Sequence, residues 1–200
     1  MLQAASAAML LAIVSVDAAQ QKTPPAAASP KKTDQRVNPN AATLADFMKR
    51  VEGYVELHKK LEGTLPKLPA QTDPYQIDRH QRAMLRLMQE ARKDAKPGDL
   101  FTPAMQRLVR NLLRPVFGGP DGRQLRAEIL DNEFKGNVKL VVNGRYPDEV
   151  PISTVPPQVL AQLPKLPEEL EYRFVHTSMI LFDPHAHIIA DFVPNALPKA

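Results

Sequence analysis

Apolar side chains recur every three or four positions in the first half of the chain, the spacing that places them on one face of a helix. The longest such run reaches from Leu44 to Leu61, with Thr43 as its expected N-cap and Gly63 as its expected end. His58 falls inside the apolar face, which predicts a hydrogen-bonded histidine in the core or at its boundary. The other apolar positions on this face are Phe47, Met48, Val51, Tyr54 and Val55.

Further helices follow, each introduced by a turn-forming sequence. Asp73-Pro74 and Thr102-Pro103 each combine a capping side chain with a proline suited to a first helical turn. The helix after Pro103 is expected to stop at Pro115, because proline lacks the amide that would continue the hydrogen bonding. A fourth, short helix is expected over about residues 122–133.

The pattern changes to short β-rich runs in the last third of the chain. Residues 138–142 alternate apolar and polar side chains ahead of Asn143-Gly144, a pair typical of a tight hairpin turn. A short helix is expected within residues 154–163. Three more β-rich runs, joined by polar turns, predict an antiparallel meander over residues 170–175, 179–182 and 187–193.

Together these patterns predict an α+β fold with a single folded domain over residues 41–200. Its N-terminal helical half, of three to four helices over residues 41–134, is expected to pack on a small C-terminal antiparallel β-meander within residues 135–195. Residues 19–40 are rich in Ala, Pro, Gln and Lys and carry a net charge of +3, which predicts a disordered basic tether.

The first residues predict export from the cytoplasm. Residues 4–16 are apolar and uncharged, too short to span a bilayer but long enough for the core of a signal peptide. Val16 and Ala18 supply a β-branched and a small side chain at the minus 3 and minus 1 positions, which predicts cleavage after Ala18, with Ala19 as the second choice. Residues 1–18 are therefore interpreted as a signal peptide. A buried N-terminal helix is the alternative. The expected location of the mature chain is the periplasm or the medium, with no transmembrane segment.

The amino-acid composition excludes several kinds of site and argues against one class of partner. The chain has no cysteine, which excludes disulfides, thiolate metal sites and cysteine nucleophiles. Residues 41–200 carry 22 basic and 20 acidic side chains, so the net charge of the folded part is only +2. A charge this small gives no support for specific nucleic-acid binding. No cofactor is predicted, and the sequence leaves the oligomeric state open.

Arginines recur within the second and third predicted helices at spacings of three and four positions, which place them on one face of each helix. Residues 78–126 hold eleven basic and five acidic side chains, whereas residues 128–191 hold five basic and ten acidic ones. Either the basic helices dock on the acidic C-terminal part, or they bind a protein or anionic polymer partner in the cell envelope. The candidate binding residues are Arg79, Arg82, Arg86, Arg107, Arg110 and Arg114.

The closest pair of histidines suggests a metal site. His185 and His187 lie two positions apart, with Asp183 two positions earlier. On an extended strand both rings point to one side, where together with a carboxylate they can hold Zn²⁺ or Ni²⁺. A turn through Pro184 to Ala186 would instead separate the two rings.

Sequence features of catalysis are weak. Ser153 and Ser178 fall in expected turns without a small-residue elbow, and Glu168, Glu169 and Glu171 form a cluster of the kind that is mostly solvated. The FGGPDG turn lacks the preceding strand and the Lys-Ser/Thr ending of a phosphate-binding loop. The chain is therefore not expected to be an enzyme.

The C-terminal stretch over residues 166–198 resembles known proteins. LPEELEYRFVHTSMILFDPHAHIIADFVPNALP combines a Tyr-Arg pair, an apolar strand ending in Asp-Pro, and a second apolar strand. It resembles the C-terminal end of an uncharacterised family of exported bacterial proteins, and it is distantly similar to small periplasmic domains of the nickel and cobalt homeostasis family. The resemblance implies a place in the cell envelope. It carries no activity, and the metal role of those small domains is not transferred, because the long helical half departs from them.

Two hypotheses of function remain. The favoured one is a non-catalytic exported protein that binds a partner through its basic helical face. The alternative is a periplasmic metal-binding protein that uses His185 and His187.

Overall fold

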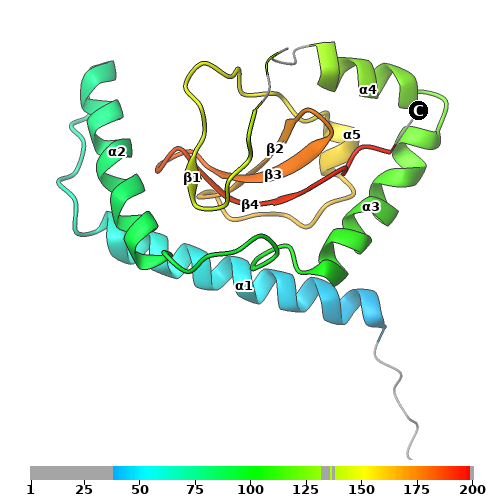
Figure 1. The fold of residues 1–200 in the computed structure, drawn as a ribbon, viewed down its shortest axis with the longest axis horizontal. Helices are drawn as coiled ribbons and strands as arrows, with labels where there is room; N and C mark the ends of the chain where they lie inside the picture. The colour runs from blue at the N-terminus through cyan, green and yellow to red at the C-terminus, as the bar shows by residue number, and fades with distance from the viewer. Residues whose placement is uncertain (1–37, 132–135, 137, 199–200) are drawn as a thin grey trace, which may run out of the picture. The chain divides into compact units, whose positions relative to one another are not determined.

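The computed structural model describes residues 38–131, 136 and 138–198. The expected signal peptide and nearly all of the expected tether lie outside these residues. The described residues form an α+β fold of helices and one sheet, as predicted (Figure 1). The elements are α1 (Pro39–Glu62), α2 (Pro74–Ala91), α3 (Pro103–Gly118), α4 (Gly122–Asp131), β1 (Gly144–Arg145), α5 (Pro157–Leu160), β2 (Glu171–Val175), β3 (Ser178–Asp183) and β4 (Ile188–Val193).

The helix α1 begins earlier than its apolar pattern does. Asn38 is the N-cap, and its Oδ1 accepts a hydrogen bond from the amide of Asn40 at 3.0 Å. The prediction of Thr43 as N-cap is therefore wrong: Asn38-Pro39 already supplies a capping side chain and a proline at the first turn. The helix ends at Gly63, as predicted.

The starts of α2 and α3 are confirmed, whereas the end of α3 is not. Asp73 and Gln76 form a reciprocal capping box at α2. Thr102 caps α3 by accepting from the amide of Met105. Pro115 does not stop α3: it lies within the last turn, and the helix continues past it to Gly118. The helix ends at Gly119, whose backbone is extended.

The sheet has the strand order β1-β4-β3-β2, with every neighbouring pair antiparallel. Strands β2, β3 and β4 form the predicted meander. The predicted strand over residues 138–142 does not form, and β1 pairs with β4 instead. The reason lies at Asn143, whose side-chain Nδ2 donates to the carbonyls of Gln89 and Arg92. The turn at Asn143 is thus fixed to the end of α2 rather than joining two paired strands.

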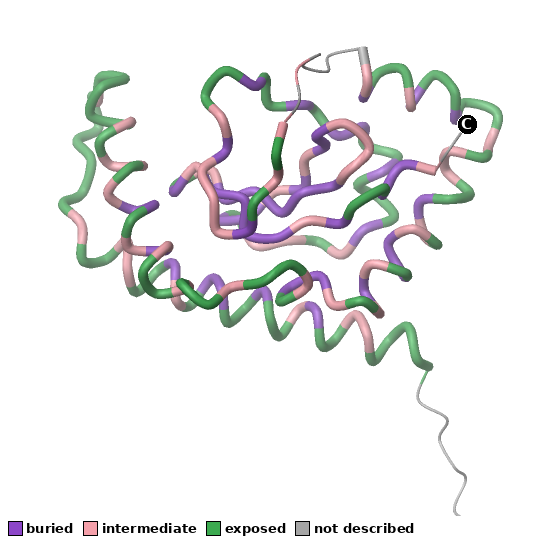
Figure 2. The backbone as a smooth tube through the Cα atoms, viewed as in Figure 1, coloured by how far each residue is buried: buried purple, intermediate pink, exposed green. Residues whose placement is uncertain are grey.

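Most residues of β2, β3 and β4 are buried (Figure 2), and they belong to two hydrophobic cores. On β3, Met179 and Leu181 belong to the main core, which the helices share, while Ile180 and Phe182 face a second, smaller core. This two-sided burial explains why β3 is an uninterrupted apolar run rather than an alternating one. The second core contains Tyr146, Val150, Val175, Ile180, Phe182 and Ile189.

The helix α1 runs along the sheet, and both α2 and α3 pack against α1 (Figure 1). In this arrangement α2 and α3 lie beside opposite ends of the sheet. The expected helix within residues 154–163 is confined to the single turn of α5. Among the described residues, no helix combines the length and the apolar character needed to cross a membrane.

Candidate metal centre

A buried carboxylate at the end of β3 holds two histidines in place. Asp183 is fully buried, and its Oδ2 accepts hydrogen bonds from the Tyr54 hydroxyl at 2.8 Å and from His58 Nδ1 at 2.7 Å. Its Oδ1 accepts from the backbone amides of His185 at 3.0 Å and Ala186 at 2.9 Å. Asp183 therefore fixes both the ring of His58 and the turn that carries His185.

The second ring nitrogen of His58 points toward two further ligand groups. His58 Nε2 lies 3.5 Å from Glu62 Oε2, and Glu62 Oε1 lies 3.0 Å from His185 Nδ1. Within the described residues, His58, Glu62 and His185 each offer one ligand atom within 4.8 Å of the others. The His58 side chain is completely buried, and its Nε2 has no hydrogen-bond partner in the described part of the chain.

Local sequence explains how these groups meet. His58 and Glu62 are four positions apart on α1, so they share one helical face. His185 follows the Asp183-Pro184 turn, in which the Asp183 side chain accepts from amides two and three residues ahead. The predicted core histidine at position 58 is confirmed, since its ring is buried and hydrogen-bonded.

The electrostatics of the cluster are set by its carboxylates. Burial lowers the pKa of His58, but the hydrogen bond and charge of Asp183, with the charges of Glu62 and Glu169, offset it and leave the pKa raised. Burial, reinforced by Asp183, raises the pKa of Tyr54 well above its usual value, so this hydroxyl stays protonated and donates. Because Asp183 accepts from Nδ1, the Nε2 of a neutral His58 carries the free lone pair.

The three groups are of types that zinc accepts as ligands. Zn²⁺ lies about 2.0–2.1 Å from imidazole nitrogen and carboxylate oxygen, so tetrahedral ligand atoms stand roughly 3.4 Å apart. The separations of 3.5 and 3.0 Å involve different oxygens of Glu62, and binding through one oxygen would need a small shift of the side chains. Two imidazoles favour Zn²⁺ or a neighbouring transition metal over Mg²⁺ or Ca²⁺. A carboxylate on the remote nitrogen of a ligand histidine, as Asp183 is here, is the usual outer-shell partner.

Comparison with known protein families, curated proteins and solved structures gives no match to this chain. Functional proposals therefore start from the geometry of the described residues.

The metal-binding residues predicted from sequence lie in three different settings. His185 belongs to the cluster, and Asp183 lies behind it as the acceptor that orients the histidines. His187 lies apart from both, with Nε2 3.5 Å from Asp148 Oδ1 and its ring edge-on to Tyr146. The turn through Pro184 to Ala186 separates the rings of His185 and His187, which is the second of the two arrangements expected from the sequence. The sequence prediction omitted His58 and Glu62, whose i,i+4 spacing was the available signal.

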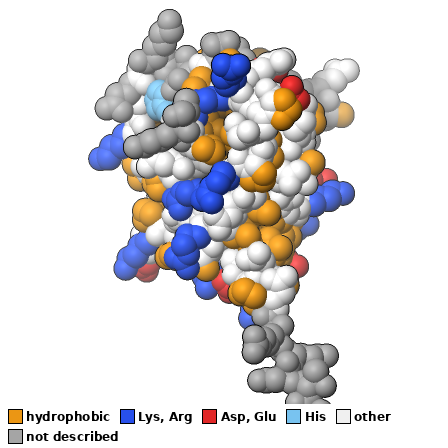
Figure 3. Space-filling model, turned by 90° about the vertical axis from the view of Figure 1, so that its right-hand side faces the viewer, with side chains coloured by type: hydrophobic (Ala, Val, Ile, Leu, Met, Phe, Trp, Pro, Cys, Tyr) orange, Lys and Arg blue, Asp and Glu red, His pale blue; other side chains and the backbone are white. Residues whose placement is uncertain are grey.

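The six arginines of the predicted basic face do not form one surface. Arg79, Arg82 and Arg86 lie on α2, whereas Arg107, Arg110 and Arg114 lie on α3, beside the opposite end of the sheet (Figure 1). On the face drawn in Figure 3, Lys and Arg side chains stand in separate groups among neutral and hydrophobic ones.

Several helix arginines are engaged within the molecule. Arg82 pairs with Asp78 at 2.7 Å and lies 3.6 Å from Asp148. Arg110 donates to the carbonyl of Pro194 at 2.9 Å. Contacts between the helices and the C-terminal part thus use backbone carbonyls as well as carboxylates.

Proposed function

We propose that this chain binds a divalent transition-metal ion, best matched by Zn²⁺, through His58 Nε2, a Glu62 carboxylate oxygen and a ring nitrogen of His185. The observation that carries the proposal is the buried Nε2 of His58, which has no hydrogen-bond partner among the described residues yet faces both other ligand groups. Leaving such a nitrogen unpaired costs free energy, and a metal ion would provide its missing partner.

The rest of the site supports the same role. The Asp183 carboxylate stabilises the tautomer of His58 that presents Nε2 to an ion. The same carboxylate holds the backbone of His185. The site is therefore organised by a residue from outside the ligand set, and only the Glu62 and His185 side chains reach the surface.

We also propose that the protein acts outside the cytoplasm as a non-catalytic binding protein. The support is the apolar opening segment, the side chains of Val16 and Ala18 at the expected cleavage site and the resemblance of the C-terminal stretch to exported proteins. A partner bound through the basic helices has less support, because Arg82 and Arg110 already contact acceptors within the molecule.

The proposal is tested by titrating the full chain with Zn²⁺ in a calorimeter. Glu62→Gln and His185→Ala each remove one ligand, so each is expected to weaken binding by more than the about 10–100-fold that loss of an outer-shell partner costs. His187→Asn is the matched control, because asparagine tolerates the positive φ of that position. Its affinity should equal that of the wild type.

Two results would overturn the proposal. One is the absence of any Zn²⁺ binding tighter than tens of micromolar. The other is loss of binding in His187→Asn with retention in Glu62→Gln, which would move the site to the residues predicted from the sequence.

A further inference from the structure

Three adjoining cavities lie beside the metal-ligand cluster and together form a groove. They have volumes of about 200, 360 and 240 Å³ and follow the end of α1, the segment of residues 63–72 and α2. Leu68 and His80 line all three cavities, and Glu62 lines two of them. His185 lines the smallest of the three, the cavity of about 200 Å³. The groove therefore begins at two of the three ligand side chains.

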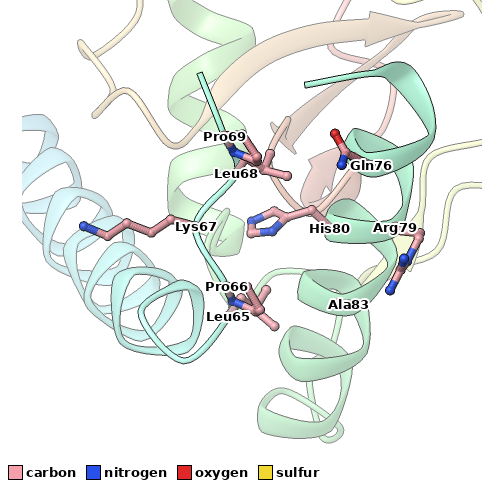
Figure 4. A pocket seen from close by; sticks show the side chains of 9 residues that line it. All are labelled: Leu65, Pro66, Lys67, Leu68, Pro69, Gln76, Arg79, His80 and Ala83. Atoms are coloured by element: carbon pink, nitrogen blue, oxygen red, sulfur yellow. The ribbon is translucent and has the colours of Figure 1, made fainter. Parts of the chain in front are cut away.

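The walls of the groove combine apolar and basic side chains. Leu68 and Ile77 are each 41% exposed, so part of their apolar surface is available for contact. Lys67 and Arg79 also contribute lining atoms, but in Figure 4 their charged groups point away from the ring of His80. In Figure 4 the ring of His80 extends from α2 toward the segment that carries Leu68.

Charge favours an anionic occupant. Among the described residues that line the three cavities, Glu62 is the only acidic one, and in the proposed site it is a metal ligand. A divalent ion held by one carboxylate and two neutral imidazoles keeps a net positive charge, so it would leave this end of the groove positive. An anion is attracted to such a groove, while a neutral molecule of the same shape gains only from apolar contact.

The position of the ligands sets where such an anion would bind. Three protein ligands leave an open coordination position on Zn²⁺. Because His58 is fully buried while Glu62 and His185 line the groove, a further ligand would reach the ion from the groove. We infer, on the basis of the proposed function, that the groove binds a small carboxylate with an apolar tail. The carboxylate completes the coordination of the ion, and the tail lies against Leu68 and Ile77.

The experiment uses octanoate as the probe and 1-octanol as its neutral counterpart of equal chain length. Zn²⁺ is first titrated into the full chain, and octanoate is then titrated into the metal-free and zinc-loaded forms. Octanoate is expected to bind the zinc-loaded form at least about tenfold more tightly than the metal-free form, because a charge-assisted contact is added. 1-Octanol should show no such difference.

A charged substitution in the groove distinguishes octanoate binding in the groove from zinc binding at the metal site. Leu68→Asp places a negative charge against the carboxylate, so this variant should retain zinc binding and lose octanoate binding. Ile152→Asp is the matched control, since Ile152 is an equally exposed aliphatic residue, at 45%, that does not line the groove. It should retain both.

The possible outcomes distinguish a failure of the groove inference from a failure of the metal site. Zinc binding with equal or absent octanoate binding in the two forms overturns the groove inference and leaves the metal site standing. Loss of octanoate binding in Ile152→Asp together with its retention in Leu68→Asp also overturns the groove inference. Failure of zinc to bind overturns the metal site, and the groove inference with it.

Discussion

At the scale of single residues, Asp183 connects the two halves of the metal site. Its oxygens accept from a helix side chain, His58, and from the backbone amide of His185 in the turn before β4. Tyr54 donates to the same oxygen as His58 and keeps that oxygen oriented. A change at Asp183 should therefore act on metal affinity through the positions of both histidines.

Asp183→Asn is expected to lower Zn²⁺ affinity by about 10–100-fold, as loss of an outer-shell carboxylate does. Titration calorimetry measures the affinity, and far-ultraviolet circular dichroism checks that the variant is folded. Asp148→Asn serves as the control, because Asp148 is an exposed carboxylate near His187. Equal zinc affinity in folded Asp183→Asn and wild type would show that Asp183 does not orient the ligands.

Glu169 gives a residue-scale prediction about pH. Burial raises its pKa, but the Lys59 ammonium, 2.9 Å from Oε1, more than offsets this and leaves the pKa below its ordinary value of 4.5. The carboxylate thus binds protons more weakly in the folded state than in the unfolded one. Its contribution to stability is fully present above pH 4.5 and is lost as the pH falls through the folded-state pKa.

Glu169→Gln should therefore have a lower free energy of unfolding than the wild type at pH 7, and the difference should shrink below pH 4.5. Denaturant unfolding between pH 3 and pH 7 measures it. Glu168→Gln, a change at an exposed neighbour, should show no such trend. A difference that stays constant across this range would contradict the assigned ion pair.

The residue scale also shows what the sequence can reveal about the site. Helical periodicity was sufficient to place His58 in the core, because a side chain's face depends on its close neighbours. Its acceptor, Asp183, is 125 positions away, and no local pattern links the two. Likewise, His185 and His187 look alike in sequence, and only the turn between them directs one to α1 and the other to Asp148.

At the scale of elements, a buried strand residue shapes the entry to a helix. Asp191 on β4 is fully buried, and its Oδ2 accepts from the amides of Leu100 at 2.9 Å and Phe101 at 2.8 Å. The amide of Gly98 also donates to this carboxylate. Gly98 has a φ of 96°, a backbone conformation that suits glycine. The sheet thereby fixes the segment that leads into α3.

Asp191→Asn would place an amide donor against backbone donors and is expected to cost about 2–3 kcal/mol of unfolding free energy. Denaturant unfolding provides the value. Asp99→Asn is the matched control, since that exposed carboxylate accepts only from the nearby amide of Lys96. A cost for Asp191→Asn no larger than that for Asp99→Asn would contradict the role of Asp191 in holding the segment before α3.

Helices and strands were predictable where residues close in sequence determined their ends and no distant contact intervened. The cap and proline pairs at Asp73 and Thr102 located two helix starts. Prediction failed where a distant contact decided the outcome, as at Asn143, whose side chain bonds to the end of α2 instead of allowing a hairpin. Pro115 shows the related limit that a proline near the end of a helix need not stop it.

At the scale of the whole molecule, the proposed ion would connect two parts of the main core. Its ligands come from α1 and from the turn between β3 and β4, which are far apart in the sequence. A ligand that binds only the folded chain stabilises it by mass action. The α+β arrangement was predictable from the change of periodicity along the chain, whereas the joining of α1 to this turn was not.

Zinc should accordingly raise the free energy of unfolding by about 2.7 kcal/mol when its free concentration is 100 times the dissociation constant. Denaturant unfolding with and without Zn²⁺ measures the gain. Glu62→Gln should lose it, whereas His187→Asn should keep it. The same gain in Glu62→Gln would show that zinc stabilises the fold from another site.

The most direct test of the metal site is anomalous diffraction at the zinc edge from crystals of the zinc-loaded chain. The account predicts a peak within bonding distance of His58 Nε2, a Glu62 carboxylate oxygen and a ring nitrogen of His185, with Asp183 still on His58 Nδ1. A peak at His187, or crystals in which His58 and Glu62 face one another with no metal peak between them, would contradict it.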